Sequence, residues 1–153
     1  MKARRVHSFE PQAHLIDVIK KTLELNQIDN VTLHQAVAGA KLGKAHLKRT
    51  HVENSGMAEF RPGAGDLPVD MLPVDDVVGE EHVTGVKIDV EGMQMPVLRG
   101  MSKTIRRCAP VLWLELRPAK GEIEQPSEWL AKRGYRRQQI SFRDFLFIPE
   151  TSA

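Results

Sequence analysis

Two carboxylates follow a short apolar run in VKIDVEG, residues 86–92, and their types and spacing suit acid–base chemistry. The β-branched residues of this stretch predict a buried strand. If the extended conformation persists, Asp89 and Glu91 face the same way at the strand's carboxyl end. Open α/β sheets bind ligands outside those ends. Gly92 lets the backbone turn at low steric cost before a helix.

The same two acids also suit a purely structural role. Glu91 could cap the following helix while Asp89 stabilises the turn, since acids are common at both places. The stretch alone leaves both interpretations open.

Length and composition predict one domain over residues 1–153. The chain is 41% hydrophobic and 27% charged, and it has no apolar run near the roughly 20 residues that a membrane helix needs. The N-terminus lacks the apolar segment of a signal peptide. The single Cys108 cannot form an internal disulfide, which fits the reducing cytoplasm where we expect the protein to act.

The net charge is only +2 but unevenly distributed, and the basic residues do not form a nucleic-acid-binding pattern. Basic pairs such as Arg4-Arg5 and Arg136-Arg137 lack interleaved aromatic residues and any nucleic-acid-binding motif. They predict solvated faces, so neither nucleic acid nor a membrane is expected as a partner.

The order of the first elements predicts an α/β fold. A strand, VHSF, ends at Glu10-Pro11, because proline cannot continue a strand ladder. Residues 13–25 have apolar side chains at helical spacing, and residues 31–39 predict a second strand. This order is typical of a parallel sheet with crossover helices.

Residues 41–73 depart from that order. They are rich in glycine and proline with only short extended runs, which predicts a hairpin or loop excursion within the domain. Asp75-Asp76 then begins a short connector, expected to form at most one helical turn.

The C-terminal part returns to regular elements. The pattern predicts a helix over 96–107, a strand over 110–116 that is buried on both faces and carries Glu115 near its end, and a helix over 126–133. YRRQQI and DFLFIP predict a closing antiparallel pair.

Three stretches in this order, HSFEPQAHLIDVIKKTLELNQIDNVTLHQAVAG, VKIDVEGMQMPVLRGM and PVLWLELRPA, resemble the FkbM family of S-adenosylmethionine-dependent methyltransferases. The resemblance implies a Rossmann-like class I methyltransferase sheet, mostly parallel with an antiparallel C-terminal pair. It also implies O-methylation of a small-molecule or glycan-like hydroxyl acceptor. In such an enzyme, Asp89 and Glu91 at the strand's carboxyl end are the expected catalytic residues, which orient or deprotonate the acceptor. Glu10 matches the acid that holds the cofactor's ribose hydroxyls, and Pro11 and Val37 are implied as further contacts to S-adenosyl-L-methionine.

One departure from the family concerns its opening strand and glycine-rich turn. None of the 11 glycines forms such a turn between an opening strand and a helix. The domain is therefore expected to be incomplete at its N-terminus, or else to work as an assembly that supplies the strand. Sheet edges left unpaired in this way predict homodimerisation or aggregation.

Other chemistries have little support in the sequence. The six histidines show no metal-ligand spacing, so no metal is predicted, although His51 and His82 remain alternative general bases. Cys108 is expected to be a packed thiol rather than a nucleophile. The alternative to an enzyme is a non-catalytic remnant of the same fold that binds little or no cofactor.

Overall fold

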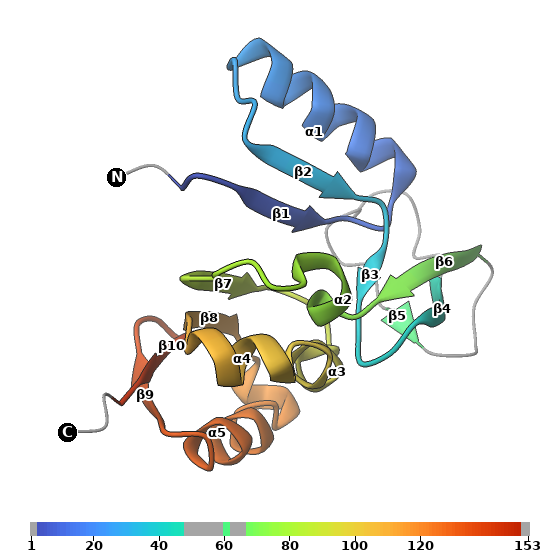
Figure 1. Ribbon diagram of the computed structural model, residues 1–153. Coiled ribbons are helices and arrows are strands. Elements are labelled where there is room, and N and C mark those ends of the chain that lie inside the picture. Colours follow the sequence, from blue (N-terminus) through green and yellow to red (C-terminus); the bar gives the residue numbers. More distant parts are fainter. Residues whose placement is uncertain (1–2, 48–59, 62–66, 151–153) are drawn as a thin grey trace.

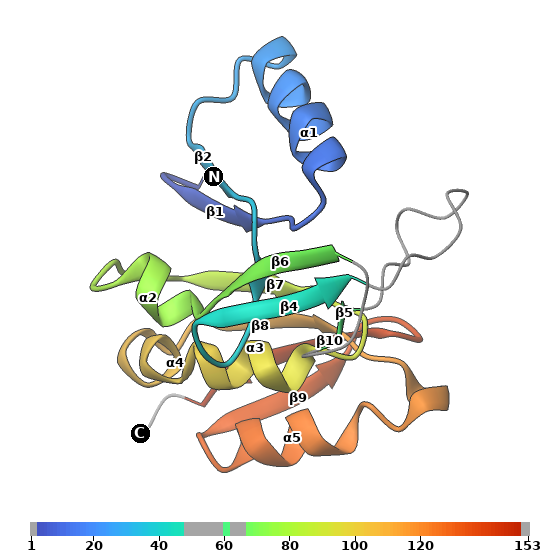
Figure 2. The same ribbon diagram turned by 90° about the vertical axis from the view of Figure 1, so that its right-hand side faces the viewer.

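The computed structural model describes residues 3–47, 60–61 and 67–150, and their strands form three sheets with helices packed around them (Figure 1). In both views, the first two strands and the helix between them lie at one end of the molecule, and the last helix lies at the other (Figure 2). The α/β class predicted from the order of elements is confirmed.

The N-terminal unit is a parallel pair with a crossover helix. Strands β1 (Val6–Phe9) and β2 (Val31–His34) pair in parallel, and α1 (Ala13–Leu25) connects them. The chain leaves the sheet at Pro11, as expected of a residue without a backbone N–H. Only Ile16 of α1 is fully buried, so little of this helix is packed against the described residues.

The central sheet holds the chain's last strand in its interior. Its order is β7 (Gly85–Ile88), β8 (Val111–Glu115), β10 (Asp144–Pro149) and β9 (Tyr135–Gln139). β7 and β8 are parallel, whereas β10 is antiparallel to both of its neighbours. The predicted closing antiparallel pair is therefore confirmed.

One face of the central sheet forms the main core. Its fully buried side chains come from β8, β10 and the helices, and include Leu98, Leu112, Leu114, Leu130, Phe145 and Phe147. The prediction that the β8 strand is buried on both faces is wrong. Val111 and Trp113 are 39% and 42% exposed, because no described element covers their face.

The connection between β7 and β8 contains two helices where the sequence predicted one. α3 (Gln94–Gly100) and α4 (Ser102–Cys108) are separated at Met101, whose φ of −120° and ψ of 20° are not helical. The Asp75 carboxylate accepts a hydrogen bond of 2.8 Å from the backbone N–H of Thr104, which caps the start of α4. Apolar periodicity continues through the break, so it could not reveal a cap that comes from another segment.

The remaining helices are short. The predicted connector at Asp75-Asp76 forms α2 (Val74–Val78), whose Val74 and Val78 join the core. After β8 come the 3-10 turn η2 (Pro118–Lys120) and α5 (Glu124–Ala131), which packs against β9.

The third sheet has the order β3 (Val37–Ala38), β6 (Leu67–Leu72), β4 (Gly43–Leu47) and β5 (Phe60–Arg61). The predicted strand over 31–39 is thus divided between β2 and β3, which belong to different sheets. The chain bends between them, where Ala36 N–H donates to the His34 carbonyl at 2.9 Å. Within the predicted excursion, residues 48–59 and 62–66 lie outside the described residues.

Side chains rather than strand pairing join the N-terminal unit to the segment before β7. Arg5 on the entry to β1 binds Glu81 at 2.6 Å, and His7 Nε2 lies 3.4 Å from the same carboxylate. His7 Nδ1 lies 3.0 Å from His34 Nε2, so one of these two nitrogens donates the hydrogen bond and the other accepts it. Burial, followed by the neighbouring His7 charge, lowers the pKa of His34. Among the described residues, β1 and β7 are not hydrogen-bonded to each other.

Candidate functional site

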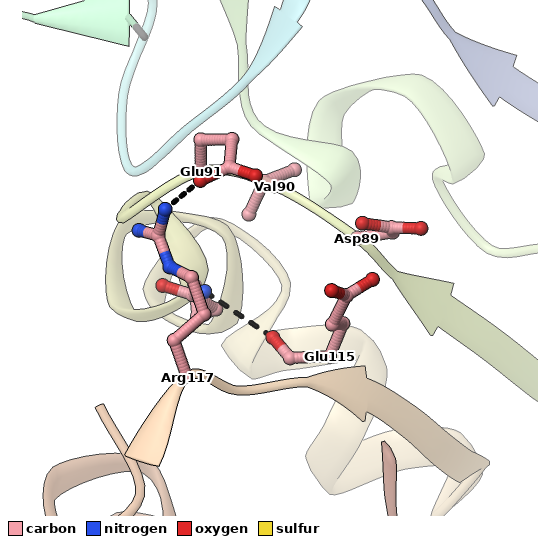
Figure 3. Close-up of a pocket in the computed structure, with 6 residues that line it drawn as sticks. Asp89, Val90, Glu91, Glu115 and Arg117 are labelled. Carbon is pink, nitrogen blue, oxygen red and sulfur yellow. Dashed lines mark hydrogen bonds and ion pairs between the residues drawn. The ribbon is translucent and has the colours of Figure 1, made fainter. Parts of the chain in front are cut away.

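A small pocket lies at the carboxyl ends of β7 and β8, the place that the VKIDVEG stretch predicted (Figure 3). Asp89, Val90, Glu91, Gln94, Glu115 and Arg117 line it. About 160 Å³ of space between these residues is not filled by atoms, but this volume includes open solvent, and no enclosed part of it is large enough for a water molecule. The described residues therefore form a shallow, open recess rather than a closed ligand cavity.

Asp89 stands beside Glu115 in this pocket. The parallel register pairs Ile88 with Leu114, so the next residues along the two segments, Asp89 after β7 and Glu115 at the end of β8, lie next to each other. Asp89 is about half exposed and accepts a hydrogen bond from Lys87 Nζ at 2.9 Å. Arg143 Nη1 lies 3.6 Å from Glu115 Oε1.

The pKa of Glu115 is raised above its ordinary value. The main cause is its hydrogen bond with Asp89, followed by burial and by the negative charges of Asp89 and Asp144, while Arg143 acts in the opposite direction. Two carboxyl groups this close hold a proton more tightly than either would alone. The pair can therefore accept a proton at a higher pH than an isolated carboxylate can.

Glu91 points away from this pair. The extended conformation ends at Ile88 and the chain bends at Glu91-Gly92, so the two acids of the motif do not face the same way. The Glu91 carboxylate forms an ion pair with Arg117 Nη1 (Figure 3). Gly92 has a φ of +75°, a conformation that favours glycine, which confirms its predicted role in the turn.

Arg117 is itself held by Glu122. Its backbone N–H donates to Glu122 Oε2 at 2.9 Å, and its Nε lies 3.0 Å from both carboxylate oxygens. Although burial raises the pKa of Glu122, the hydrogen bonds and charge of Arg117 outweigh it, and the pKa lies below its ordinary value. Glu122 therefore loses its proton more readily beside Arg117 than an isolated glutamate does.

Sequence reasoning did not find Gln94, Arg117 or Glu122. The signal for Arg117 was present, since an arginine two residues after Glu115 at a strand end suits an ion pair with a nearby acid. Gln94 and Glu122 had no local signal, because a contact between α3 and the loop after η2 depends on the tertiary fold.

The predicted cofactor residues lie outside the pocket. Glu10 is half-buried just after β1, where its Oε1 accepts a hydrogen bond of 2.8 Å from the Gln12 N–H. Pro11 is half-buried beside it, whereas Val37 is 6% exposed in the core around β3. None of the three lines the pocket at β7 and β8.

The other candidate residues that the structure describes do not line the pocket. His82 is exposed, and His51 lies outside the described residues. Cys108 is half-buried, with its Sγ accepting from Val83 N–H at 3.5 Å. Residues 3–47, 60–61 and 67–150 contain no group of three or more His, Cys, Asp or Glu side chains that could hold a metal ion. No helix in those ranges is long and apolar enough to cross a membrane.

Comparison with known proteins places this chain in a family. The model of the methyltransferase FkbM domain matches residues 1–137. Methyltransferase 1 of Beauveria bassiana (strain ARSEF 2860) is 24% identical over an alignment of 152 positions, which covers 84% of this chain and 61% of that protein. The chain thus spans about three fifths of this curated relative.

A solved structure shows the same fold. The crystal structure of methyltransferase FkbM from Methylobacillus flagellatus KT matches with a TM-score of 0.67 and 18% identity, over 94% of this chain and 36% of that one. The predicted Rossmann-like methyltransferase fold is confirmed. Since the family model covers most of the residues, the chain belongs to the FkbM methyltransferase family.

Proposed function

We propose that this chain is the catalytic part of an S-adenosylmethionine-dependent methyltransferase that methylates a hydroxyl of a small-molecule or carbohydrate-like acceptor. The observation that carries the proposal is the acid-lined pocket at the carboxyl ends of β7 and β8 in a chain of this family. Carboxylates there can accept a hydrogen bond and then a proton from a hydroxyl group.

The two acids of VKIDVEG would have different roles in catalysis. Asp89, which is accessible and paired with Glu115, would take the proton of the acceptor hydroxyl. Glu91, tied to Arg117, would orient the acceptor from the opposite side of the pocket. When bound, S-adenosylmethionine would supply an electrophilic methyl group on a sulfonium.

Glu10 is the residue proposed to hold the cofactor's ribose. Its carboxylate follows directly after a strand end, and a carboxylate has about four lone-pair sites, so it can accept from two hydroxyls besides the Gln12 N–H. Pro11 and Val37 stay predicted contacts. Because the Val37 side chain is buried, its backbone is the part that a ligand would reach.

Glu10→Gln is expected to weaken binding of S-adenosylmethionine roughly 5- to 150-fold. The physical reason is the loss of a charged acceptor of hydrogen bonds, which costs about 1–3 kcal/mol. Calorimetry, or NMR titration where binding is weak, measures the change. Glu24→Gln on the exposed part of α1 is the matched control and should bind like the wild type. Equal affinity in both variants would remove Glu10 from the site.

We also propose that the protein self-associates through the sheet edges at β1 and β7. Both strands carry backbone groups that no other described strand pairs with on that side, and such edges favour pairing between chains. Light scattering after gel filtration should give a mass that rises with protein concentration. A monomer with one cooperative melting transition at about 100 μM, a concentration at which exposed edges normally associate, would contradict this.

A further inference from the structure

One hydrogen-bonded network joins four separate segments around the pocket. Its members are Glu91 in the turn after β7, Gln94 at the start of α3, Arg117 after β8, and Glu122 after η2. Gln94 is 4% exposed, and its Nε2 donates both to Glu122 Oε2 and to the Glu115 carbonyl, each at 3.2 Å. The network therefore runs from the end of β8 to the turn that carries Asp89.

Arg117 is held more firmly on one side than on the other. Glu122, five residues along the chain, accepts from its backbone N–H, its Nε and its Nη2. These contacts fix the guanidinium on its own loop without any contribution from β7. Its Nη1 then reaches Glu91.

Partial burial distinguishes this ion pair from those at the surface. The side chains of Arg117, Glu122 and Glu91 are 15%, 14% and 29% exposed, whereas Lys44 and Asp70 in a surface pair are about 60% exposed. Exposed pairs contribute little, but removing one member of a buried pair leaves an uncompensated charge. Loss of Arg117 would therefore take away the ion-pair partner of the half-buried Glu91 carboxylate.

We propose that Arg117 is a positioning residue of the acceptor pocket, which fixes the 89–92 turn through Glu91 and thereby holds Asp89 beside Glu115. Its importance for turnover rests on the proposed function, but the positioning itself does not. The test therefore uses two measurements that need neither cofactor nor acceptor.

The first measurement is the backbone order parameter of Gly92 from 15N relaxation. In the wild type it should be about 0.85, and in Arg117→Met it should fall below about 0.6, the ranges for rigid and flexible backbone. Arg117→Lys keeps the charge but loses the planar fork, so it should give an intermediate value. A rigid Gly92 in Arg117→Met would overturn the proposal.

The second measurement is the pKa of the Glu115 carboxyl from a 13C NMR titration. Asp89 raises this pKa, so Arg117→Met should lower it toward the ordinary value, with partial recovery in Arg117→Lys. If Arg117→Met only lowered the stability of the protein, the pKa of Glu115 would stay raised. That outcome would also overturn the proposal.

Arg143→Met is the matched control. Arg143 contacts Glu115 from β10's entry but is 56% exposed and has no contact with Glu91 among the described residues. Its removal should leave Gly92 rigid and raise the pKa of Glu115, since Arg143 lowers it. If Arg117→Met does not fold, Glu122→Gln loosens the same guanidinium from its other side and should produce the same two changes more weakly. Absence of methyl transfer by the wild type would contradict the proposed function and leave both measurements valid.

Discussion

Replacing Gly100 by alanine should lower the free energy of unfolding by about 3 kcal/mol or more, the upper range for overpacking. A Cβ on Gly100 would lie 1.8 Å from the Gly39 carbonyl oxygen and 2.9 Å from its carbon. Both are backbone atoms, so no side-chain rotation relieves the clash. Alanine is favoured over glycine within a helix by only about 1 kcal/mol. The clash outweighs this gain, so the substitution lowers the free energy of unfolding.

Urea denaturation measures this change. Gly85→Ala is the matched control, because a Cβ there meets only the Val111 carbonyl oxygen at an ordinary 3.8 Å. The control should stay within about 1 kcal/mol of the wild type. Equal stability of Gly100→Ala and the wild type would mean that α3 and the loop after β3 are farther apart than described.

Asp89→Asn should lower turnover by about 10²- to 10⁴-fold, the range for losing a general base. The amide keeps the size of the side chain but cannot take a proton from a hydroxyl. The melting temperature should change little. Asp89 is half exposed, and its ion pair with Lys87 is of the surface kind that contributes at most about 1 kcal/mol.

The readout is methyl transfer from labelled S-adenosylmethionine, together with thermal denaturation. Asp70→Asn is the matched control, since Asp70 forms a similarly exposed pair with Lys44 away from the pocket. It should retain the wild-type rate. A wild-type rate in Asp89→Asn with a large loss of stability would make Asp89 a structural residue.

The sequence predicted the elements whose contacts are local. The helix over 13–25 and the strand that leads into Asp89 follow from side-chain periodicity, and the structure contains both. The break at Met101 was missed because its cause, the cap from Asp75, lies in another segment.

The candidate site shows the same limit. The position of Asp89 at a strand's carboxyl end was predictable from the pattern of VKIDVEG, and so was the turn at Gly92. The direction of the Glu91 side chain was not predictable from that pattern. It depends on Arg117, a residue 26 positions away whose own orientation depends on Glu122.

The place of β10 between β8 and β9 has a consequence for synthesis on the ribosome. Phe145 and Phe147, both almost fully buried, belong to the last strand of the chain, yet they fill the centre of the main core. The ribosome releases residues in order, so β7, β8 and β9 emerge before β10. In the sheet, β10 lies between β8 and β9. Until residue 149 has emerged, β8 and the helices packed against it lack the core side chains Phe145 and Phe147. Apolar surface exposed in this way favours aggregation, so we expect the nascent chain to be most prone to aggregation at this stage.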